Sequence, residues 1–403
     1  MLNQRLDQLQ DYPFARLNAL IADITPKANI APVAMSIGDP QGQPPEFAIK
    51  IIADHADKWN GYPPVIGTFE LRTAIKTWLD RRYALPRDLI DIETQIAPVA
   101  GTREGLFIIA QLAVNGAKNG QKPVALMPNP FYQVYNAAAV MAGAEPVYLT
   151  TTEATGFLPD LDAIGEETLQ RTALFYLCSP GNPQGAIASI DYIKKALGLA
   201  RKYDFLLVMD ECYAELYYTP QAPQGGLQAA LALGPGKDGH PLDNLVCFHT
   251  LSKRSSAAGM RSGFGVGSPT TIKLLNRLRS FSCAAQPYPI QAASAALWAE
   301  EGHAVATREA YAKRMESAQR HLGKLPGFYA PKGGMFLWIE VGNGEDAARK
   351  LWRDAAIKVL PGEYLTKPEK DGTNTGQRYI RVALVHDYET CDAALSRMAQ
   401  VLG

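Results

Sequence analysis

The sequence predicts an α/β protein built on a mostly parallel, doubly wound sheet of seven strands. From about residue 95, short apolar runs alternate with segments of helical periodicity, a pattern typical of strand–helix–strand units. The runs are apolar almost throughout, as expected of strands covered on both faces. The expected strands span residues 95–100, 123–127, 146–149, 173–178, 205–209, 245–250 and 263–266.

The helices expected before and between these strands follow from apolar residues at helical spacing. They span residues 15–24, 48–58, 69–83, 103–114, 132–142 and 191–202. Because a parallel sheet binds its ligand beyond the carboxyl ends of the strands, we expect the functional residues to lie where these strands end.

The alternation stops near residue 289, and a smaller α+β unit is expected beyond it. Its elements are a long helical segment at 290–322, strands at 333–339 and 379–383, a helix at 346–354 and a C-terminal helix, with a mobile loop at 366–377. A chain of 403 residues is long enough for two such domains.

Composition excludes several classes of function. Lysine plus arginine and aspartate plus glutamate both number 40, so no overall field attracts nucleic acid or an anionic membrane surface. No apolar run approaches the ~20 residues of a membrane span. The N-terminus is polar and does not resemble a signal peptide. The five cysteines are widely spaced, as free thiols in a reducing compartment would be. We therefore expect a cytoplasmic protein without nucleic-acid or membrane partners.

The most informative stretch runs over residues 244–267. Its apolar strand ends in Thr250, Ser252 and Lys253, and a second cation, Arg261, follows eight residues after the lysine. Burial lowers the pKa of a lysine, and a neutral amine can attack a carbonyl to form a Schiff base. Hydroxyls beside a fixed arginine suit a phosphate. Taken alone, a Ser-Lys pair is more often a surface lysine after a core strand.

Other expected strands also end in reactive or polar residues. Residues 100–104 form a glycine turn at a helix start, which offers backbone N–H groups to an anion. Residues 179–185 form a rigid turn that presents Asn182. Asp210 closes an apolar strand, where a buried carboxylate needs a partner, and residues 128–132 place aromatic rings at a strand end. Each signal alone fits an ordinary cap, turn or core contact.

Together these residues suit pyridoxal phosphate, whose aldehyde needs a lysine and whose pyridinium needs a carboxylate. The elements Asn182-Pro183-Gln184-Gly185, Asp210-x-x-Tyr213 and Ser252-Lys253…Arg261 stand in the order and spacing of one family. Over nearly its full length the chain resembles the class I/II aminotransferases of fold type I, which depend on pyridoxal phosphate.

The resemblance implies a role for each matching residue. Lys253 would carry the cofactor, Asp210 would pair with its ring nitrogen, Tyr132 would stack on the ring, and Tyr213 with Asn182 would bind its phenolic oxygen. Arg381 would clamp the substrate α-carboxylate, assisted by Asn182 and the backbone of Gly38. The implied phosphate contacts are the backbone of Gly101, Thr102 and Arg103, together with Thr250, Ser252 and Arg261.

The resemblance also implies the organisation of the molecule. A large cofactor-binding domain would span residues 46–289, and the small domain would combine residues 1–45 with residues 290–403. The enzyme would be a homodimer, in which Tyr62 of one subunit reaches the cofactor phosphate of the other.

The substrate follows less directly. Residues 101–104, 128–132 and 252–264 resemble N-succinyl-L,L-diaminopimelate aminotransferases of bacterial lysine and cell-wall biosynthesis, which use glutamate and 2-oxoglutarate. Arg103 and Arg254 could bind a distal carboxylate or could face solvent. The alternatives are a broader aspartate, alanine or aromatic aminotransferase, and a C–S lyase on the same scaffold.

Three further interpretations are less favoured. A regulatory protein would add a DNA-binding unit with a basic recognition helix, and the charge balance gives no sign of one. A catalytically inactive binding protein conflicts with the filled site positions. The alternating glycines of residues 263–267 lack dinucleotide-loop spacing, and Ser268-Pro269 argues against a helix directly after them. The six histidines have no metal-ligand spacing, and His249 is expected in the core or behind the site.

Overall fold

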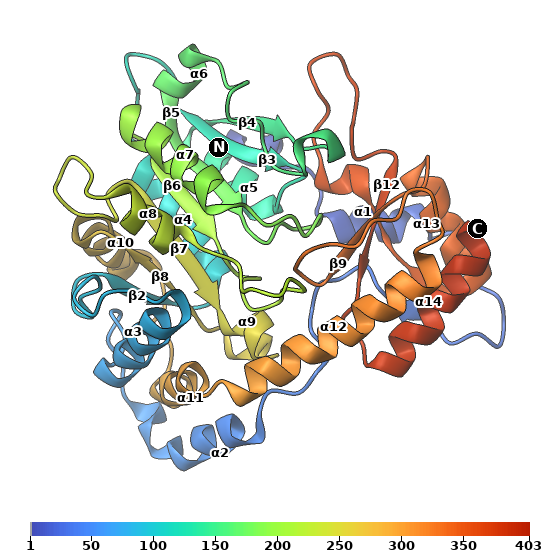
Figure 1. The fold of residues 1–403 in the computed structure, drawn as a ribbon, viewed down its shortest axis with the longest axis horizontal. Helices are drawn as coiled ribbons and strands as arrows, with labels where there is room; N and C mark the ends of the chain where they lie inside the picture. The colour runs from blue at the N-terminus through green and yellow to red at the C-terminus, as the bar shows by residue number, and fades with distance from the viewer. Residues whose placement is uncertain (1) are drawn as a thin grey trace.

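The structure, a computed structural model, describes residues 2–403 and is organised around one seven-stranded sheet (Figure 1). The strand order is β2-β8-β7-β6-β5-β3-β4. The strands are β2 (Ile96–Val99), β3 (Val124–Asn129), β4 (Glu145–Thr150), β5 (Thr172–Cys178), β6 (Leu206–Asp210), β7 (Leu245–Thr250) and β8 (Gly263–Gly267). All seven expected strands are therefore confirmed, and the fold is that of an α/β protein.

Only β8 runs against the direction of its neighbours in this sheet. It pairs antiparallel with β7 and with β2, whereas β3 to β7 pair in parallel. Gly263, at the start of β8, therefore pairs with Thr250, at the carboxyl end of β7.

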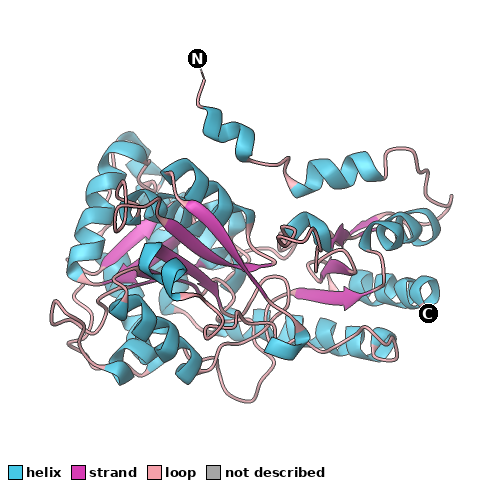
Figure 2. Ribbon diagram, turned by 90° about the horizontal axis from the view of Figure 1, so that it is seen from above, coloured by secondary structure: helices cyan, strands magenta, loops and turns pink. Residues whose placement is uncertain are grey.

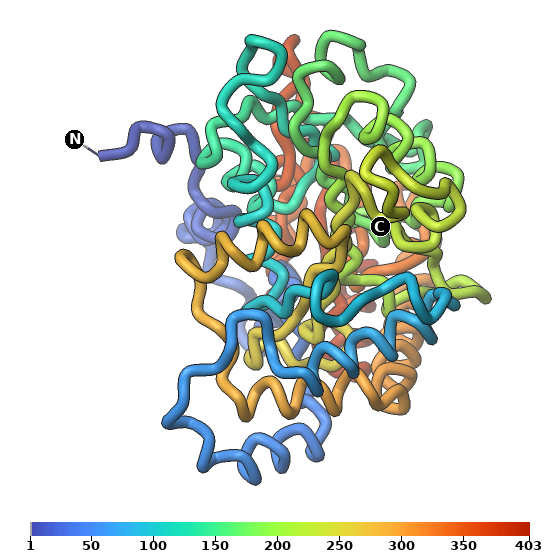
Figure 3. Tube along the Cα trace, turned by 90° about the vertical axis from the view of Figure 1, so that its left-hand side faces the viewer, coloured from blue at the N-terminus to red at the C-terminus, as the bar shows by residue number. Residues whose placement is uncertain are grey.

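Helices cover both faces of the sheet, as a doubly wound fold requires. One apolar core joins the sheet to α4 (Thr102–Ala113), α5 (Gln133–Ala142) and α10 (Pro269–Ser282). The other joins it to α2 (Glu46–Asp54), α3 (Phe69–Tyr83), α6 (Glu166–Arg171), α7 (Ile190–Lys202), α8 (Gly226–Leu233) and α11 (Tyr288–Ala299). Helix α2 packs beside α11, far from it in sequence (Figure 3).

A second region, on the right in Figure 1, is built on three antiparallel strands. They are β9 (Phe336–Glu340), β11 (Leu360–Pro361) and β12 (Tyr379–Ala383), packed with α12 (Gly302–Leu322), α13 (Gly344–Ala355) and α14 (Tyr388–Leu402). The short 3₁₀ helices of the chain are η1 (Gln4–Gln8), η2 (Ala56–Asn60), η3 (Glu153–Thr155), η4 (Ala258–Met260) and η5 (Gly362–Leu365).

The N-terminal segment joins this second region. Strand β1 (Val33–Ala34) pairs in parallel with β10 (Ile357–Lys358), and Val33 and Met35 belong to its apolar core. The expected boundary after residue 289 falls inside α11, whose Ala293, Leu297 and Trp298 pack in the core of the large sheet. We therefore propose that the large domain spans residues 46–299 and that the small domain combines residues 2–45 with residues 300–403. Helix α1 (Pro13–Leu20) also packs here. The N-terminal η1 has no buried residue and lies at the surface (Figure 2), where Arg5 donates to Met141 O of α5 at 3.0 Å.

The structure corrects some expected helices. The long segment at 290–322 is two helices, because α11 ends at Ala299 and α12 starts at Gly302. The expected helix at 48–58 starts earlier and ends at Asp54, before η2. The Ser268-Pro269 pair starts α10 instead of preventing a helix: Ser268 Oγ accepts the Thr271 N–H, and proline suits the first helical position.

None of the helices described over residues 2–403 is both long enough and apolar enough to cross a bilayer.

Candidate active site

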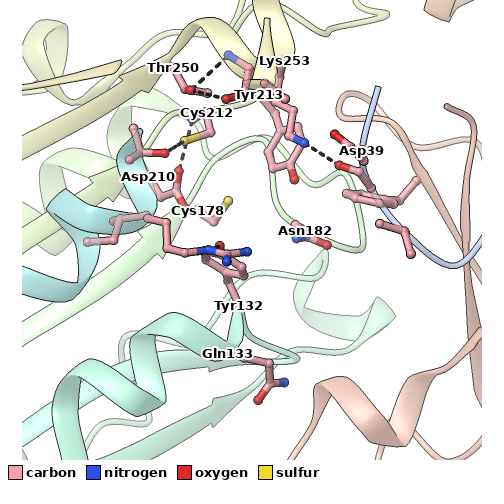
Figure 4. A pocket seen from close by; sticks show the side chains of 18 of the residues that line it. Asp39, Tyr132, Gln133, Cys178, Asn182, Asp210, Cys212, Tyr213, Thr250 and Lys253 are labelled. Carbon is pink, nitrogen blue, oxygen red and sulfur yellow. Dashed lines mark hydrogen bonds between the residues drawn. The ribbon is translucent and has the colours of Figure 1, made fainter. Parts of the chain in front are cut away.

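A cavity of about 530 Å³ opens where the sheet meets the small region (Figure 4). It lies at the carboxyl ends of the central strands, as expected for a parallel sheet. The structure brings twelve of the expected site residues to its wall: Gly38, Thr102, Arg103, Tyr132, Asn182, Asp210, Tyr213, Thr250, Ser252, Lys253, Arg261 and Arg381.

Lys253 lies in the short helix α9 (Leu251–Arg254), directly after β7. Thr250 caps this turn by accepting the Ser252 N–H, and its hydroxyl also donates to Ser252 Oγ at 3.0 Å. The Lys253 ammonium donates to Gly38 O at 2.5 Å. Burial lowers the pKa of Lys253 to about 8, so part of this amine is neutral and nucleophilic near neutral pH.

Asp210 ends β6 and is almost completely buried. Its Oδ2 accepts the Tyr135 hydroxyl at 2.5 Å and its Oδ1 accepts the Cys212 N–H at 3.2 Å. Burial raises the pKa of Asp210, and these donors oppose that rise by stabilising the charged form. The site therefore holds a buried carboxylate with directed hydrogen bonds, ready for a cationic N–H group.

An anion cradle lies at the start of α4. Gly101 caps this helix at φ 81° without a capping side chain, so the first backbone N–H groups are left to a ligand. A Cβ on Gly101 would lie 2.2 Å from an Arg261 guanidinium nitrogen, so only glycine lets that cation approach so closely. Arg261 itself is left-handed, at φ 52°, and its guanidinium donates to Ala258 O at 2.9 Å.

Arg381 lies on β12 and is buried in the cavity wall. Its guanidinium donates to Ser36 O at 2.7 Å and to Asn182 Oδ1 at 3.2 Å, and it lies over the Phe336 ring at 4.4 Å. Its Nε has no hydrogen-bond partner among residues 2–403. Burial lowers the pKa of Arg381 to about 10. A buried cation with an unused donor suits an incoming carboxylate.

The aromatic residues line the same cavity. Tyr132 precedes α5, and its hydroxyl accepts the Arg103 Nε–H at 2.9 Å. Tyr213 lies buried with its ring edge-on to Phe336. Gly38 meets the same phenylalanine, because a Cβ there would lie 2.4 Å from the Phe336 Cζ atom. Glycine at position 38 therefore lets the backbone pack directly against the Phe336 ring.

Two expected residues lie elsewhere. Tyr62 is fully exposed and is not part of the cavity wall. Arg254, expected near the site or facing solvent, is instead buried between Trp78 and Trp298, where it donates to Leu297 O and pairs with the Glu301 carboxylate. It is a structural arginine, and this prediction was wrong. His249 is buried behind the site, 3.2 Å from the Glu211 carboxylate, as expected.

Sequence reasoning missed three residues that surround Asp210. Cys178 and Cys212 line the cavity, and the Cys212 thiol lies 3.0 Å from the Thr102 hydroxyl. Tyr135 reaches the Asp210 carboxylate from α5. The signal that could have found Tyr135 is its spacing of three from Tyr132, which places both rings on one helix face.

The chemistry of this wall fits pyridoxal phosphate. The glycine cradle with Arg261 suits its phosphate, and the buried Asp210 carboxylate suits its ring nitrogen. Lys253, with its lowered pKa, suits its aldehyde. The buried Arg381 guanidinium in the cavity wall then suits the carboxylate of an amino acid.

Comparisons with known proteins agree with this chemistry. The family model for aminotransferase class I and II matches residues 31–398. An LL-diaminopimelate aminotransferase of Syntrophobacter fumaroxidans is 28% identical over 407 aligned positions, 99% of this chain and 98% of that protein. The one of Moorella thermoacetica is also 28% identical, over 99% of this chain and 98% of that protein.

Solved structures give the same result. An aminotransferase from Neisseria meningitidis superposes with a TM-score of 0.93 at 36% identity, and each chain is covered completely. An aminotransferase from Helicobacter pylori gives 0.88 at 31% identity, over 98% of this chain and 99% of that one. The match to the family model, over most of the sequence, shows that the chain belongs to the class I and II aminotransferases, a family of pyridoxal-phosphate-dependent enzymes.

Proposed function

We propose that the enzyme moves the amino group of a diaminopimelate-type amino acid to 2-oxoglutarate. Transamination is supported mainly by one observation: the Lys253 amine, the Asp210 carboxylate and the Arg381 guanidinium line the same cavity. When bound, pyridoxal phosphate supplies an aldehyde that takes up amino groups and a ring that withdraws electrons.

Different side chains bind the substrate, transfer the proton and stabilise the charge on the ring. Arg381 and Asn182 hold the α-carboxylate and so fix which bond of the α-carbon faces Lys253. The Lys253 amine takes the α-proton from the donor and returns a proton to the α-carbon of the new amino acid in the second half-reaction. Asp210 keeps a negative charge beside the ring nitrogen.

Two observations support the substrate class. The residues near the cavity mouth include Arg103, close to the Tyr12 and Tyr132 hydroxyls, so a cation is available for a second carboxylate. The curated relatives named above are LL-diaminopimelate aminotransferases. The sequence motifs favour N-succinyl-L,L-diaminopimelate, and the names of these relatives favour LL-diaminopimelate.

A donor panel tests the proposal. The cofactor-loaded enzyme is given each diaminopimelate compound, aspartate, alanine or phenylalanine together with 2-oxoglutarate, and glutamate and ammonia are measured. We expect glutamate without ammonia, and the highest kcat/KM for one of the two diaminopimelate compounds. Ammonia release without glutamate would instead indicate a lyase, and equal rates for all donors would indicate a broad aminotransferase.

Arg103 provides a variant for the same panel. Arg103→Met should lower kcat/KM for the diaminopimelate donor by roughly ten- to hundredfold, the range of a hydrogen bond to a charged group, with little change for alanine. Arg353→Met removes an exposed arginine paired with Asp354 and is the matched control. An equal loss for both donors would contradict the assignment of Arg103 to a distal carboxylate.

We also propose a homodimer with shared sites. Tyr62 is fully exposed, and Trp59, Ile66 and Phe69 expose apolar surface on the same segment. A second, largely apolar cavity of about 600 Å³ adjoins the phosphate cradle, with Arg103 and Arg261 in its wall. The exposed apolar segment around Tyr62 of another copy would fit this second cavity. The Tyr62 hydroxyl would then reach the cofactor phosphate.

A further inference from the structure

Tyr135 is buried beneath the cavity and contacts the one carboxylate that the proposed mechanism needs. It lies on α5, and its hydroxyl donates to Asp210 Oδ2 at 2.5 Å. The other carboxylate oxygen accepts the Cys212 N–H at 3.2 Å. Asp210 therefore keeps its charge in an apolar setting through fixed donors.

The ring of Tyr135 is held in place by aromatic contacts. It stacks on Tyr176 with the ring centroids 4.5 Å apart and the planes 7° from parallel. Tyr132, at the cavity wall, meets it edge-on at 5.6 Å. The Tyr176 hydroxyl donates to Leu106 O at 2.7 Å and does not contact Tyr135 or Asp210, so the support that Tyr176 gives comes from the face of its ring. The Tyr135 hydroxyl is thus aimed at Asp210 by two packed rings.

Several titratable groups surround Asp210. They come from α5 (Tyr135), β5 (Cys178), the turn after β6 (Cys212 and Tyr213) and β7 (His249). Burial raises the pKa of Tyr135 and of both thiols. Near neutral pH Tyr135 and the two thiols therefore stay uncharged, and the phenol is a hydrogen-bond donor that does not compete for negative charge.

We propose that Tyr135 is a positioning residue that keeps Asp210 ionised and oriented toward the cofactor ring nitrogen. The proposal rests on the role proposed above for Asp210. Without the hydroxyl, the buried carboxylate loses a donor that favours its charged form and fixes its orientation. A larger fraction of Asp210 is then protonated at a given pH, and a protonated or misoriented carboxyl group binds a cationic N–H group less well.

Tyr135→Phe tests this inference, because it deletes one oxygen and keeps the ring. Apoenzyme is titrated with pyridoxal phosphate by absorbance, and the visible band of the saturated enzyme is then followed from pH 5 to 10. We expect a roughly ten- to hundredfold weaker cofactor affinity, as for loss of a hydrogen bond to a charged group. We also expect a displaced pH midpoint of the band.

Tyr176→Phe is the matched control. It removes the hydroxyl of the neighbouring stacked ring, which bonds to Leu106 O and does not touch Asp210. Its cofactor affinity and pH midpoint should stay within about twofold of those of the parent enzyme, well below the effect of a charged hydrogen bond. Thermal unfolding of both apoenzymes, compared with the parent, separates loss of folding from loss of binding.

The outcomes are distinct. If Tyr135→Phe matches the parent enzyme in affinity and midpoint, or if Tyr176→Phe changes both as much, the inference is wrong while the proposed function stands. If the parent enzyme itself gains no visible band with pyridoxal phosphate, the proposed function fails and the inference fails with it.

Discussion

Among the lysines, Lys253 has the pKa that is lowered furthest from the value of an exposed side chain. Desolvation brings its pKa down to about 8, against 10.5 for an exposed side chain. The fraction of neutral amine therefore rises as pH rises through about 8 and is nearly complete two units higher. Cofactor loading needs the neutral amine, so its rate should follow this fraction.

This behaviour predicts a pH profile. The rate at which apoenzyme gains the visible band after mixing with pyridoxal phosphate should rise with a midpoint near pH 8 and level off about two units higher. Lys253→Ala should gain no visible band and show no turnover. Lys273→Ala, which changes an exposed lysine, should gain the band at the rate of the parent enzyme. A rate that keeps rising in proportion to hydroxide up to pH 10 would show an ordinary lysine.

Arg381 supports a second prediction at the residue scale. Arg381→Lys keeps the charge but loses the planar guanidinium that can bind a carboxylate through two parallel hydrogen bonds. We expect KM for amino-acid donors to rise by roughly ten- to hundredfold, with cofactor affinity unchanged.

The control is Arg378→Lys, an exposed arginine that precedes the same strand and pairs with Glu340. An unchanged KM in Arg381→Lys, or an equal change in Arg378→Lys, would show that the substrate carboxylate binds elsewhere.

Residues differ in how far sequence alone predicts them. Lys253, Asp210 and Asn182 could be identified because each follows a recognisable strand or turn. Arg254 could not, because its burial depends on Trp78 and Trp298, which are distant in sequence. The hydrogen bond from Tyr135 to Asp210 joins two elements and leaves no local signature.

At the scale of elements, α4 must approach β7 closely to bring its N-terminus to the phosphate position. Gly105 makes this possible, because a Cβ there would lie 2.4 Å from the Phe248 Cε1 atom. Phe248 is buried in β7, the strand that carries Lys253 at its end. One glycine thus sets the spacing between the anion cradle and the lysine.

Gly105→Ala should lower the free energy of unfolding by about 1–3 kcal/mol through overpacking, and it should weaken cofactor binding because α4 is displaced. Gly198→Ala is the matched control: that glycine lies in α7 with nothing near its Cβ position, so alanine should stabilise by about 0.5–1 kcal/mol. Urea denaturation of both apoenzymes measures the difference. Equal effects of the two substitutions would contradict the close-contact argument.

The elements themselves were predictable to different degrees. Strands β5 and β7 stand out because each is an apolar run buried along its whole length, whereas the edge strand β4 is only half-buried throughout. Strands β1, β10 and β11 have two residues each and show no periodicity, so only their partners define them. The break between α11 and α12 falls at Glu300 and Glu301, which are compatible with a continuous helix.

At the scale of the whole molecule, the site draws on distant parts of the chain. Arg381 lies in the C-terminal region, its partner Ser36 follows β1, and Asn182 belongs to the turn after β5. The position of Arg381 in the cavity wall therefore depends on the packing of both regions. The proposed dimer would extend this dependence to a second copy.

Subunit mixing tests the dimer. If Tyr62 acts in the partner's site, a heterodimer of Lys253→Ala and Tyr62→Ala subunits contains one site with both defects and one intact site. Co-refolded mixtures should then be more active than either homodimer. Sedimentation should show a dimer for each species. If Tyr62 acted within its own subunit, mixing would give only the average of the two activities.

The reversed direction of β8 has a consequence for how the enzyme can vary. Lys253 and Arg261 lie near the two ends of the connection between the antiparallel neighbours β7 and β8. The register of these two strands is fixed by their pairing in the sheet. The length of the segment between β7 and β8 therefore sets the distance between the Lys253 amine and the Arg261 guanidinium. An insertion or deletion there would misalign the two charges, so chain-length changes should be excluded from this hairpin and accumulate in loops that face away from the ligand.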